Sequence, residues 1–159
     1  MSRLGPDLGR IEGRTHILPV RVYYEDTDAG GIVYHANYLR YAERGRSDFL
    51  RLLGVHHQAL AELPGRLGLA VRHCAFDYLA PARLDDALEV ATTLTAMTGA
   101  TLEAEQIVRR DGQDLVRGQV RIACIAANGR PRRLPDEMRR LLAPLCPSIS
   151  LQDDEAPAR

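Results

Sequence analysis

Four strand-like segments follow one another in the second half of the chain, with no helix-like segment between them. Their apolar residues alternate or run together over residues 69–79, 87–97, 101–110 and 115–126. Two of the connections, at 98–100 and 111–113, are short enough to be hairpins, and hairpins join antiparallel strands. The sequence therefore predicts an antiparallel sheet, and such a sheet has to bury an apolar face against another element.

A single long amphipathic segment, residues 37–53, is able to cover that face. Its apolar or small side chains recur at intervals of three and four residues, at Tyr38, Tyr41, Ala42, Gly45, Phe49, Leu52 and Leu53. Asn37 is suited to cap the start of the helix, and Gly54 is suited to end it. A glycine inside a helix costs roughly 1 kcal/mol relative to alanine. We therefore expect the helix backbone to lie close against the sheet at Gly45.

One earlier strand is predicted where Val20, Val22 and Tyr24 alternate with Arg21 and Tyr23. The order of one strand, one helix and four strands predicts an α+β fold, with an antiparallel sheet of about five strands wrapped around one long central helix. Pro135 introduces a further short amphipathic segment. The edges of such a sheet favour self-association, so we expect a homodimer or a homotetramer.

The composition is that of a soluble globular domain. Hydrophobic residues make up 45% and charged residues 26% of the 159 residues. Glycine, proline and charge without periodicity at both ends predict a single domain over 15–145, between flexible tails at 1–14 and 146–159. The 21 Lys and Arg balance the 21 Asp and Glu, which argues against a nucleic-acid partner. No apolar run reaches membrane-spanning or signal-peptide length, so we expect a cytoplasmic protein without an integral membrane segment.

The most specific motif lies between the first strand and the helix. It runs from Tyr23 to Tyr38 through Glu25-Asp26-Thr27-Asp28-Ala29-Gly30-Gly31 and His35, continues at Tyr41-Ala42-Glu43-Arg44, and has a second part at Tyr78-Leu79-Ala80-Pro81-Ala82-Arg83-Leu84-Asp85-Asp86. This pattern resembles the hotdog-fold acyl-CoA thioesterases of the 4-hydroxybenzoyl-CoA thioesterase and YbgC family. The resemblance implies hydrolysis of acyl-CoA without a metal or other cofactor, in dimers or tetramers of dimers whose active sites are shared between subunits. It maps the catalytic aspartate onto Asp28 and the motif histidine onto His35.

Thioester hydrolysis needs a carboxylate as nucleophile or as general base, together with donors for the developing oxyanion. Asp28 is expected to supply the carboxylate, and His35 to orient the substrate or water or to donate to the carbonyl. We expect Tyr24, Gly30, Gly31 and Gly68 to bind the substrate, with the N–H groups of the paired glycines near the carbonyl.

These residues also have alternative interpretations. A carboxylate before a helix often serves as a cap, which is the alternative for an isolated Asp28. A calcium-binding EF-hand loop would need an oxygen ligand at Gly30 and a glutamate at Asn37, so this interpretation is excluded. Ser47 lacks the G-x-S-x-G setting of a nucleophilic serine, and His56-His57 lacks a metal-binding partner at suitable spacing. A module that binds acyl-CoA or acyl carrier protein without hydrolysis stays open as the second function, and a hotdog dehydratase as the third.

CoA carries several phosphates, so arginines should line part of its binding groove. The candidates are Arg72, Arg83, Arg109 and Arg110, and a cluster of Arg130, Arg132 and Arg133. The alternative at each of these positions is an arginine that is simply solvated at the surface. The turn Thr98-Gly99-Ala100 lacks the basic residues that relatives often carry there.

The three cysteines, Cys74, Cys124 and Cys146, are widely spaced and form no C-x-x-C pair. Cys74 alternates with its neighbours in a predicted strand. We expect all three to be core thiols.

Overall fold

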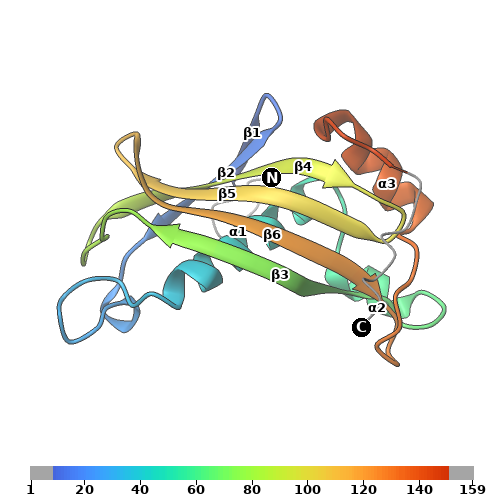
Figure 1. Cartoon of the computed structure of the whole chain (residues 1–159), viewed down its shortest axis with the longest axis horizontal. Helices are drawn as coiled ribbons and strands as arrows, with labels where there is room; N and C mark the ends of the chain where they lie inside the picture. Colours follow the sequence, from blue (N-terminus) through green and yellow to red (C-terminus); the bar gives the residue numbers. More distant parts are fainter. Residues whose placement is uncertain (1–8, 151–159) are drawn as a thin grey trace, which may run out of the picture.

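The computed structural model describes residues 9–150. Its elements, in chain order, are β1 (Arg10–Glu12), β2 (Thr15–Arg21), η1 (Tyr24–Asp26), α1 (Asn37–Leu52), α2 (His57–Glu62), β3 (Gly68–Tyr78), β4 (Ala87–Met97), β5 (Thr101–Arg110), β6 (Gln113–Ile125), α3 (Asp136–Leu142) and η2 (Ala143–Leu145). Figure 1 shows the strands as one curved sheet, with helices at its ends and behind it.

The sheet is antiparallel throughout, in the order β1-β2-β4-β5-β6-β3. The predicted antiparallel sheet is thus confirmed, but it has six strands instead of about five. The additional strand is β1, where Ile11 pairs with His16 of β2 across the turn at Gly13. Three residues are too few to show a period, so the sequence pattern missed this strand.

Strands and hydrogen bonds extend past both limits of the expected domain, 15–145, and the remainder of the expected tails, 1–8 and 151–159, lies outside the described residues. β1 lies before residue 15. After residue 145, Met97 N donates to Ser148 O at 2.9 Å and Ser150 N donates to Met97 O at 2.8 Å. Backbone groups on both sides of the expected domain therefore find hydrogen-bond partners in the sheet, which is what orders chain ends.

The first predicted strand lies earlier than its alternation indicated. β2 ends at Arg21, so Val22 and Tyr24 follow it, and Pro19 lies inside it. Proline is tolerated where a strand lacks a neighbour on one side. β1 pairs only with Thr15–Ile17, so at Pro19 the strand is bonded to β4 alone.

The predicted close approach of the helix to the sheet at Gly45 is confirmed. A Cβ atom on Gly45 would lie 2.9 Å from Val90 Cγ1 and 3.1 Å from Thr92 Oγ1 of β4. Gln106 of β5 fixes this contact, because its Nε2 donates to Ala42 O and to Thr92 Oγ1, both at 2.8 Å. The single long helix of the prediction is joined by α2 and α3, and no helix within residues 9–150 has the length and apolarity needed to cross a membrane.

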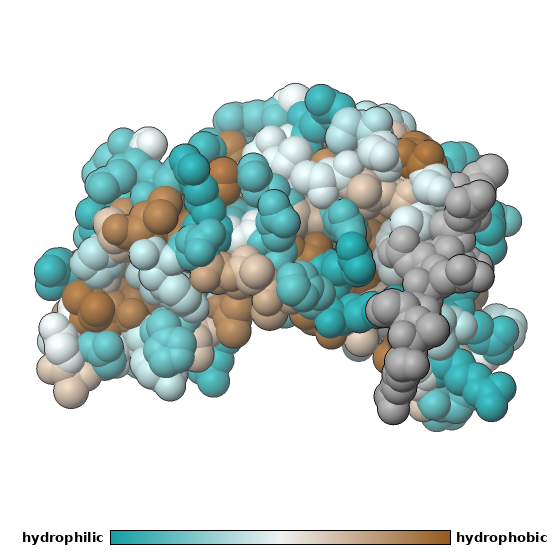
Figure 2. Space-filling view, in the orientation of Figure 1, coloured by the Kyte–Doolittle hydropathy of each residue, from teal (hydrophilic) through white to brown (hydrophobic). Residues whose placement is uncertain are grey.

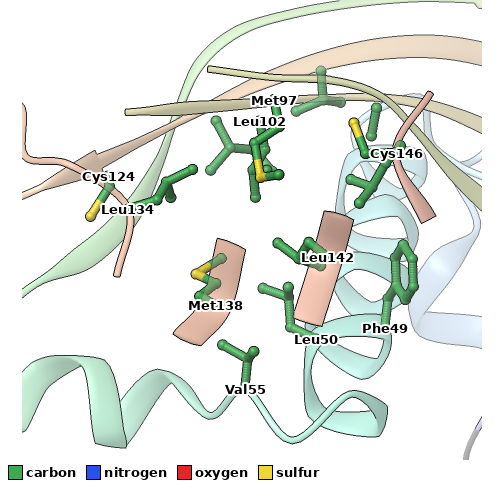
Figure 3. Packing of buried hydrophobic residues seen from close by; sticks show 14 of the residues in the cluster. Phe49, Leu50, Val55, Met97, Leu102, Cys124, Leu134, Met138, Leu142 and Cys146 are labelled. Carbon is green, nitrogen blue, oxygen red and sulfur yellow. The ribbon is translucent and has the colours of Figure 1, made fainter. Parts of the chain in front are cut away.

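The buried apolar side chains form two clusters along the sheet. One joins α1 and β2 to the start of β4, the end of β5 and the start of β6, next to the loop before α1. The other lies where α2 and α3 meet the sheet, and Figure 3 shows Met138 and Leu142 of α3 between Met97 and Leu102 of the sheet and Leu50 and Val55. The helix α3 therefore closes one end of the core.

Strand β3 differs from the other long strands because neither of its faces is buried. It is the last strand of the sheet, whereas α1 packs against β2, β4 and β5. Val71 is 49% exposed. Cys74 is also exposed, so its predicted place in the core is wrong, although Cys124 and Cys146 are buried. Strand β3 is therefore an 11-residue edge strand with no covering element, the kind of surface on which further strands pair.

A buried pair, His16 and Asp48, joins β2 to α1. His16 is fully buried, its Nε2 lies 2.7 Å from Asp48 Oδ2, and its ring stacks on Phe49. Its Nδ1 has no hydrogen-bond partner. Burial lowers the pKa of His16 below its ordinary 6.5, and this outweighs the opposing effect of Asp48. The ring is therefore neutral in the folded protein, with its proton on Nε2 toward Asp48.

The lowered pKa of His16 predicts a loss of stability in mild acid. Below pH 6.5 the unfolded chain binds a proton at this residue that the folded protein does not. The free energy of unfolding should fall by up to about 1.4 kcal/mol per pH unit between 6.5 and the native pKa. Urea unfolding of wild type and His16→Gln at pH 7.5 and 5.5 measures it. Equal losses in the two proteins would contradict the prediction.

Candidate active site

The loop between η1 and α1 folds back on itself and is held at several points. Asp28 N donates to Ile32 O at 2.9 Å, and Gly31 N donates to Asp28 O at 3.0 Å. Gly31 has a φ of +78°, a conformation that favours glycine. Val33 N donates to Ala82 O at 2.9 Å, which ties the loop to the segment before β4. The loop therefore presents its side chains from a fixed backbone.

Asp28 lies at the exposed tip of this loop. Its Oδ1 accepts a hydrogen bond from Gly30 N at 2.8 Å. Within residues 9–150 its Oδ2 has no hydrogen-bond partner and no cation is paired with it. One oxygen is thus held in place while the other stays available to a ligand.

A cavity of about 390 Å³ opens beside the loop. Its walls are Asp28, Ile32, Val33, His35, Tyr38, Tyr78, Leu79, Ala80 and Pro81. Figure 2 shows hydrophobic surface gathered at the lower left, where Figure 1 places the loop between η1 and α1. An apolar wall with few polar groups is typical of a small-molecule site. The sequence-predicted Asp28 and His35 are brought together in this wall.

Aromatic rings form one side of the cavity. The Tyr78 hydroxyl donates to His35 O at 2.9 Å, and the Tyr78 ring lies edge-on to His35 and Tyr38, with centroids 6.3 and 5.7 Å away. The Tyr38 hydroxyl accepts from Ala82 N at 3.0 Å. Burial raises the pKa of both Tyr38 and Tyr78. Both hydroxyls therefore stay protonated near neutral pH and act as structural supports.

The segment just before α1 has two unpaired backbone donors, one of them on His35 in the cavity wall. The helix starts at Asn37 after Ala36. The N–H groups of His35 and Ala36 have no acceptor in the part of the chain that the structure describes. Such groups carry the partial positive charge of a helix start, so they suit an oxygen that becomes negative.

Asp26 and Asn37 support the loop from beneath. Asp26 is buried, its Oδ2 accepts from Tyr23 N at 2.9 Å, and its carbonyl accepts from Asn37 Nδ2 at 2.7 Å. The predicted capping role of Asn37 is therefore wrong, because its side chain fastens the preceding segment instead. Burial, together with nearby Asp26, raises the pKa of Tyr41. Asp26 thus has a structural role.

The four residues expected to bind substrate are placed differently. Gly30 and Gly31 lie in the loop, but their N–H groups already donate to Asp28, so neither is a free donor. Tyr24 is 82% exposed, at the start of η1, and does not line the cavity. Gly68 begins β3, at the opposite end of that strand from Tyr78. Tyr24, Gly30 and Gly31 were predicted from their place in the motif and Gly68 from its place before a strand, and neither fixes the direction of a side chain or an N–H group.

Residues 78–81 are the part of the wall to which the sequence assigned no role. They belong to the second part of the motif, so the signal was present in the sequence. They are brought to Asp28 by contacts that are distant in the chain: the pairing of β3 with β6, the bond from Tyr78 to His35 and the bond from Val33 N to Ala82 O.

The arginines proposed for CoA phosphates fall into two groups. Arg109 pairs with Glu89 and Arg110 pairs with Asp86, so both are already engaged. Arg72 and Arg83 have no ion pair with any described residue, and the cluster of Arg130, Arg132 and Arg133 has none either. Within residues 9–150, no group of three or more His, Cys, Asp or Glu side chains is arranged to hold a metal ion.

Comparison with known proteins gives consistent matches. The family model of the thioesterase-like superfamily matches residues 22–142. The acyl-CoA thioesterase YbgC of Haemophilus influenzae is 43% identical over 122 residues, which are 76% of this chain and 89% of the relative. The acyl-CoA thioester hydrolase YbgC of Escherichia coli O157:H7 is 44% identical over 74% of this chain and 87% of its own.

Solved structures match as well. A probable thioesterase from Bartonella henselae has a TM-score of 0.74 and 41% identity, over 76% of this chain and 99% of that one. A 1,4-dihydroxy-2-naphthoyl-CoA thioesterase from Synechocystis has a TM-score of 0.75 and 25% identity, over 81% and 96%. The matched residues 22–142 include both the loop of Asp28 and the wall of the cavity. The chain therefore belongs to the thioesterase-like superfamily and, within it, to the YbgC family of hotdog-fold proteins.

Proposed function

We propose that this chain hydrolyses acyl-CoA thioesters to the free acid and CoA, with Asp28 as the catalytic carboxylate. The observation that carries this proposal is that Asp28, with one unbonded oxygen, and His35, whose N–H group is unbonded, line the same apolar cavity, with the unbonded N–H group of Ala36 next in the chain. Thioester hydrolysis needs these two elements, a carboxylate and oxyanion donors. The YbgC relatives carry the same activity in their names.

Two routes use this geometry. In the first, an Asp28 oxygen attacks the thioester carbon, the C–S bond breaks, and the CoA thiolate leaves and takes a proton; water then hydrolyses the acyl-aspartate anhydride. In the second, Asp28 takes a proton from water as the water oxygen attacks, and the proton passes to the leaving sulfur. Each route consumes one water. In both, the oxyanion accepts hydrogen bonds at the amino end of α1, where each donor contributes about 3–4 kcal/mol to lowering the barrier.

The acyl group would lie against Ile32, Val33 and the rings of Tyr38 and Tyr78. The side chain of His35 lies in the same wall, and the centroid of its ring is 4.4 Å from that of Tyr34. From this position it would orient the thioester or the attacking water. Because His35 lies next to the unbonded donors, we assign it to positioning the substrate or water, and we assign the attack or proton transfer to Asp28.

We also propose that the active unit is a homodimer paired through β3. The outer edge of β3 has unpaired backbone groups, and Tyr78 and Leu79 at its end are 49% and 55% exposed while they also line the cavity. A second copy would cover these side chains and close the open side of the site.

A panel of acyl-CoAs tests the proposed activity. We expect thiol release, followed with a chromogenic disulfide, from at least one class among short-chain, long-chain and aromatic acyl-CoAs. A typical enzyme turns over about 1 to 1,000 times per second. Heat-unfolded protein serves as the blank for spontaneous hydrolysis. Tight acyl-CoA binding in a calorimeter without thiol release from any ester would contradict hydrolysis and favour a binding module.

A further inference from the structure

Two backbone N–H groups just before α1, on His35 and Ala36, have no acceptor among residues 9–150. They belong to successive peptide groups, because the His35 N–H shares its peptide with the Tyr34 carbonyl and the Ala36 N–H shares its peptide with the His35 carbonyl. A peptide group is planar, and none between residues 9 and 150 is cis. Whatever binds each carbonyl oxygen therefore also fixes the direction of the N–H on the same plane.

The first of these peptide groups is held by the backbone. Tyr34 O accepts from Asn37 N at 2.8 Å, in the turn that leads into α1. Both are main-chain atoms, so a change of side chain does not remove the bond. The His35 N–H thus keeps its direction through the local fold alone.

The second peptide group is held by a side chain. In a regular helix His35 O would accept from Leu39 N, four residues later. Leu39 N donates to Ala36 O at 3.1 Å instead, a bond across three residues as in a 3₁₀ helix. In the part of the chain that the structure describes, no backbone N–H donates to His35 O, and the Tyr78 hydroxyl does so at 2.9 Å. A side chain from β3 therefore completes the start of α1.

Tyr78 is built to remain a donor at this position. Figure 1 shows the end of β3, where Tyr78 lies, near the loop before α1. Its ring lies in the cavity wall, edge-on to the rings of His35 and Tyr38. Burial, with a smaller effect from nearby Cys74, raises the pKa of Tyr78 above the ordinary 10.0. The hydroxyl thus keeps its proton at neutral pH, and that one proton is given to His35 O.

We infer that Tyr78 is a positioning residue for thioester hydrolysis, whose hydroxyl holds the peptide between His35 and Ala36 so that the Ala36 N–H is fixed as a donor to the oxyanion. This inference rests on the proposed function. A carbonyl that accepts a hydrogen bond also polarises its peptide, which strengthens the N–H as a donor. Oxyanion stabilisation is large because its donors are fixed before the reaction begins. Tyr78 would supply that fixation from outside the loop and the helix.

The first test removes the hydroxyl and keeps the ring. We expect Tyr78→Phe to lower kcat for the best acyl-CoA by about 10- to 100-fold with KM little changed, less than the about 10²- to 10³-fold typical for loss of a whole oxyanion donor. Tyr34→Phe is the matched control, because its hydroxyl bonds no residue in 9–150 and its ring is not in the cavity wall. It should keep the wild-type kcat and KM. A folded Tyr78→Phe protein with the wild-type kcat overturns the inference.

Direct proton donation from Tyr78 to the leaving sulfur is the rival role. An S-aryl thioester of the same acyl group separates the two roles, because an aryl thiolate leaves without needing a proton. If Tyr78 positions the donor, Tyr78→Phe loses the same factor on the aryl thioester as on the acyl-CoA. A wild-type rate on the aryl thioester alone would make Tyr78 a general acid and overturn the inference.

A fluorinated tyrosine tests the hydroxyl in a protein that keeps it. Fluorine lowers the pKa of a phenol, and a phenolate does not donate to His35 O. With 3-fluorotyrosine in place of Tyr78, kcat should therefore begin to fall at an alkaline pH at which wild type is still fully active. The other titratable groups around this hydroxyl are the same in both proteins, namely Asp28, His35, Tyr38 and Cys74. Coincident pH profiles would contradict the positioning role.

The carbonyl of a bound substrate gives a readout without turnover. The acyl-CoA of the panel that binds most tightly, labelled with ¹³C at its thioester carbonyl, is bound to Asp28→Asn and to Asp28→Asn/Tyr78→Phe. Hydrogen bonds to the oxygen move the ¹³C resonance downfield, so the resonance should lie closer to that of free substrate in the double variant, at equal affinity by calorimetry. Equal ¹³C shifts in the two proteins would overturn the inference. If wild type releases no thiol from any ester but the ¹³C shift depends on Tyr78, the proposed function fails while the positioning of the donor stands.

Discussion

Replacing Asp28 by asparagine is expected to lower kcat by about 10²- to 10⁴-fold, with a small effect on KM. The amide keeps the shape of the side chain, and its oxygen still accepts the hydrogen bond from Gly30 N. It neither attacks a thioester carbon nor takes a proton from water. Because the residue is exposed, the fold should be unaffected. Thiol release from the best acyl-CoA, measured at saturating substrate, gives the comparison.

Glu25→Gln is the matched control for this variant, since it makes the same change of charge at an exposed carboxylate three residues earlier. It should retain nearly full activity. An Asp28→Asn protein that keeps more than a tenth of wild-type kcat would rule out Asp28 as the catalytic carboxylate.

The two routes through Asp28 differ in where an oxygen atom comes from. In a single turnover in H₂¹⁸O, attack by Asp28 followed by hydrolysis of the anhydride at its aspartyl carbonyl transfers an aspartate oxygen to the product acid and leaves ¹⁸O in the aspartate. General-base catalysis places ¹⁸O in the product and leaves the protein unlabelled, and so does hydrolysis of the anhydride at its acyl carbonyl. Label in the peptide that contains Asp28, measured by mass spectrometry, therefore identifies the nucleophilic route.

The secondary structure was predictable where its signals are local. β4 and β5 have the predicted bounds, 87–97 and 101–110, because their apolar patterns end at short turns. Gly45 predicted the contact between helix and sheet, because a glycine within a helix is favoured over alanine where the helix backbone lies close to another element. β1 has three residues and exists only because β2 pairs with it, so no local pattern announces it.

The order of the strands in the sheet cannot be predicted from local sequence patterns. The errors in the predictions for β3 and for the candidate site follow from this. The alternation around Cys74 indicates one buried face, but β3 is the edge strand, and α1 packs mainly against β2, β4 and β5. The same holds at the candidate site. The motif predicted Asp28 and His35. Tyr78 comes next to them through tertiary contacts, the pairing of β3 with β6 and its hydrogen bond to His35 O.

Removing the buried carboxylate of Asp48 is expected to have the largest effect on stability. Its Oδ2 accepts from Gly9 N at 2.8 Å and lies 2.7 Å from His16 Nε2. Both donors lose their partner in Asp48→Ala, and His16 is fully buried, so water does not replace the carboxylate. Leaving a buried donor without its partner typically costs about 1 to 3 kcal/mol, and here two donors lose theirs. Because this approaches the total stability of many domains, the variant is expected to express poorly or to unfold at low urea.

Asp48→Asn keeps the prediction measurable if the alanine variant does not fold. The amide oxygen still accepts a hydrogen bond from one of the two donors, so the loss should be about 1 to 3 kcal/mol. Glu43→Ala removes an exposed carboxylate from the same helix and should change the free energy of unfolding by no more than about 0.5 kcal/mol. Urea unfolding at pH 7.5 compares the three variants with wild type. We expect the free energy of unfolding to fall most in Asp48→Ala, less in Asp48→Asn and least in Glu43→Ala. An Asp48→Ala protein as stable as Glu43→Ala would show that the junction between β2 and α1 does not depend on this pair.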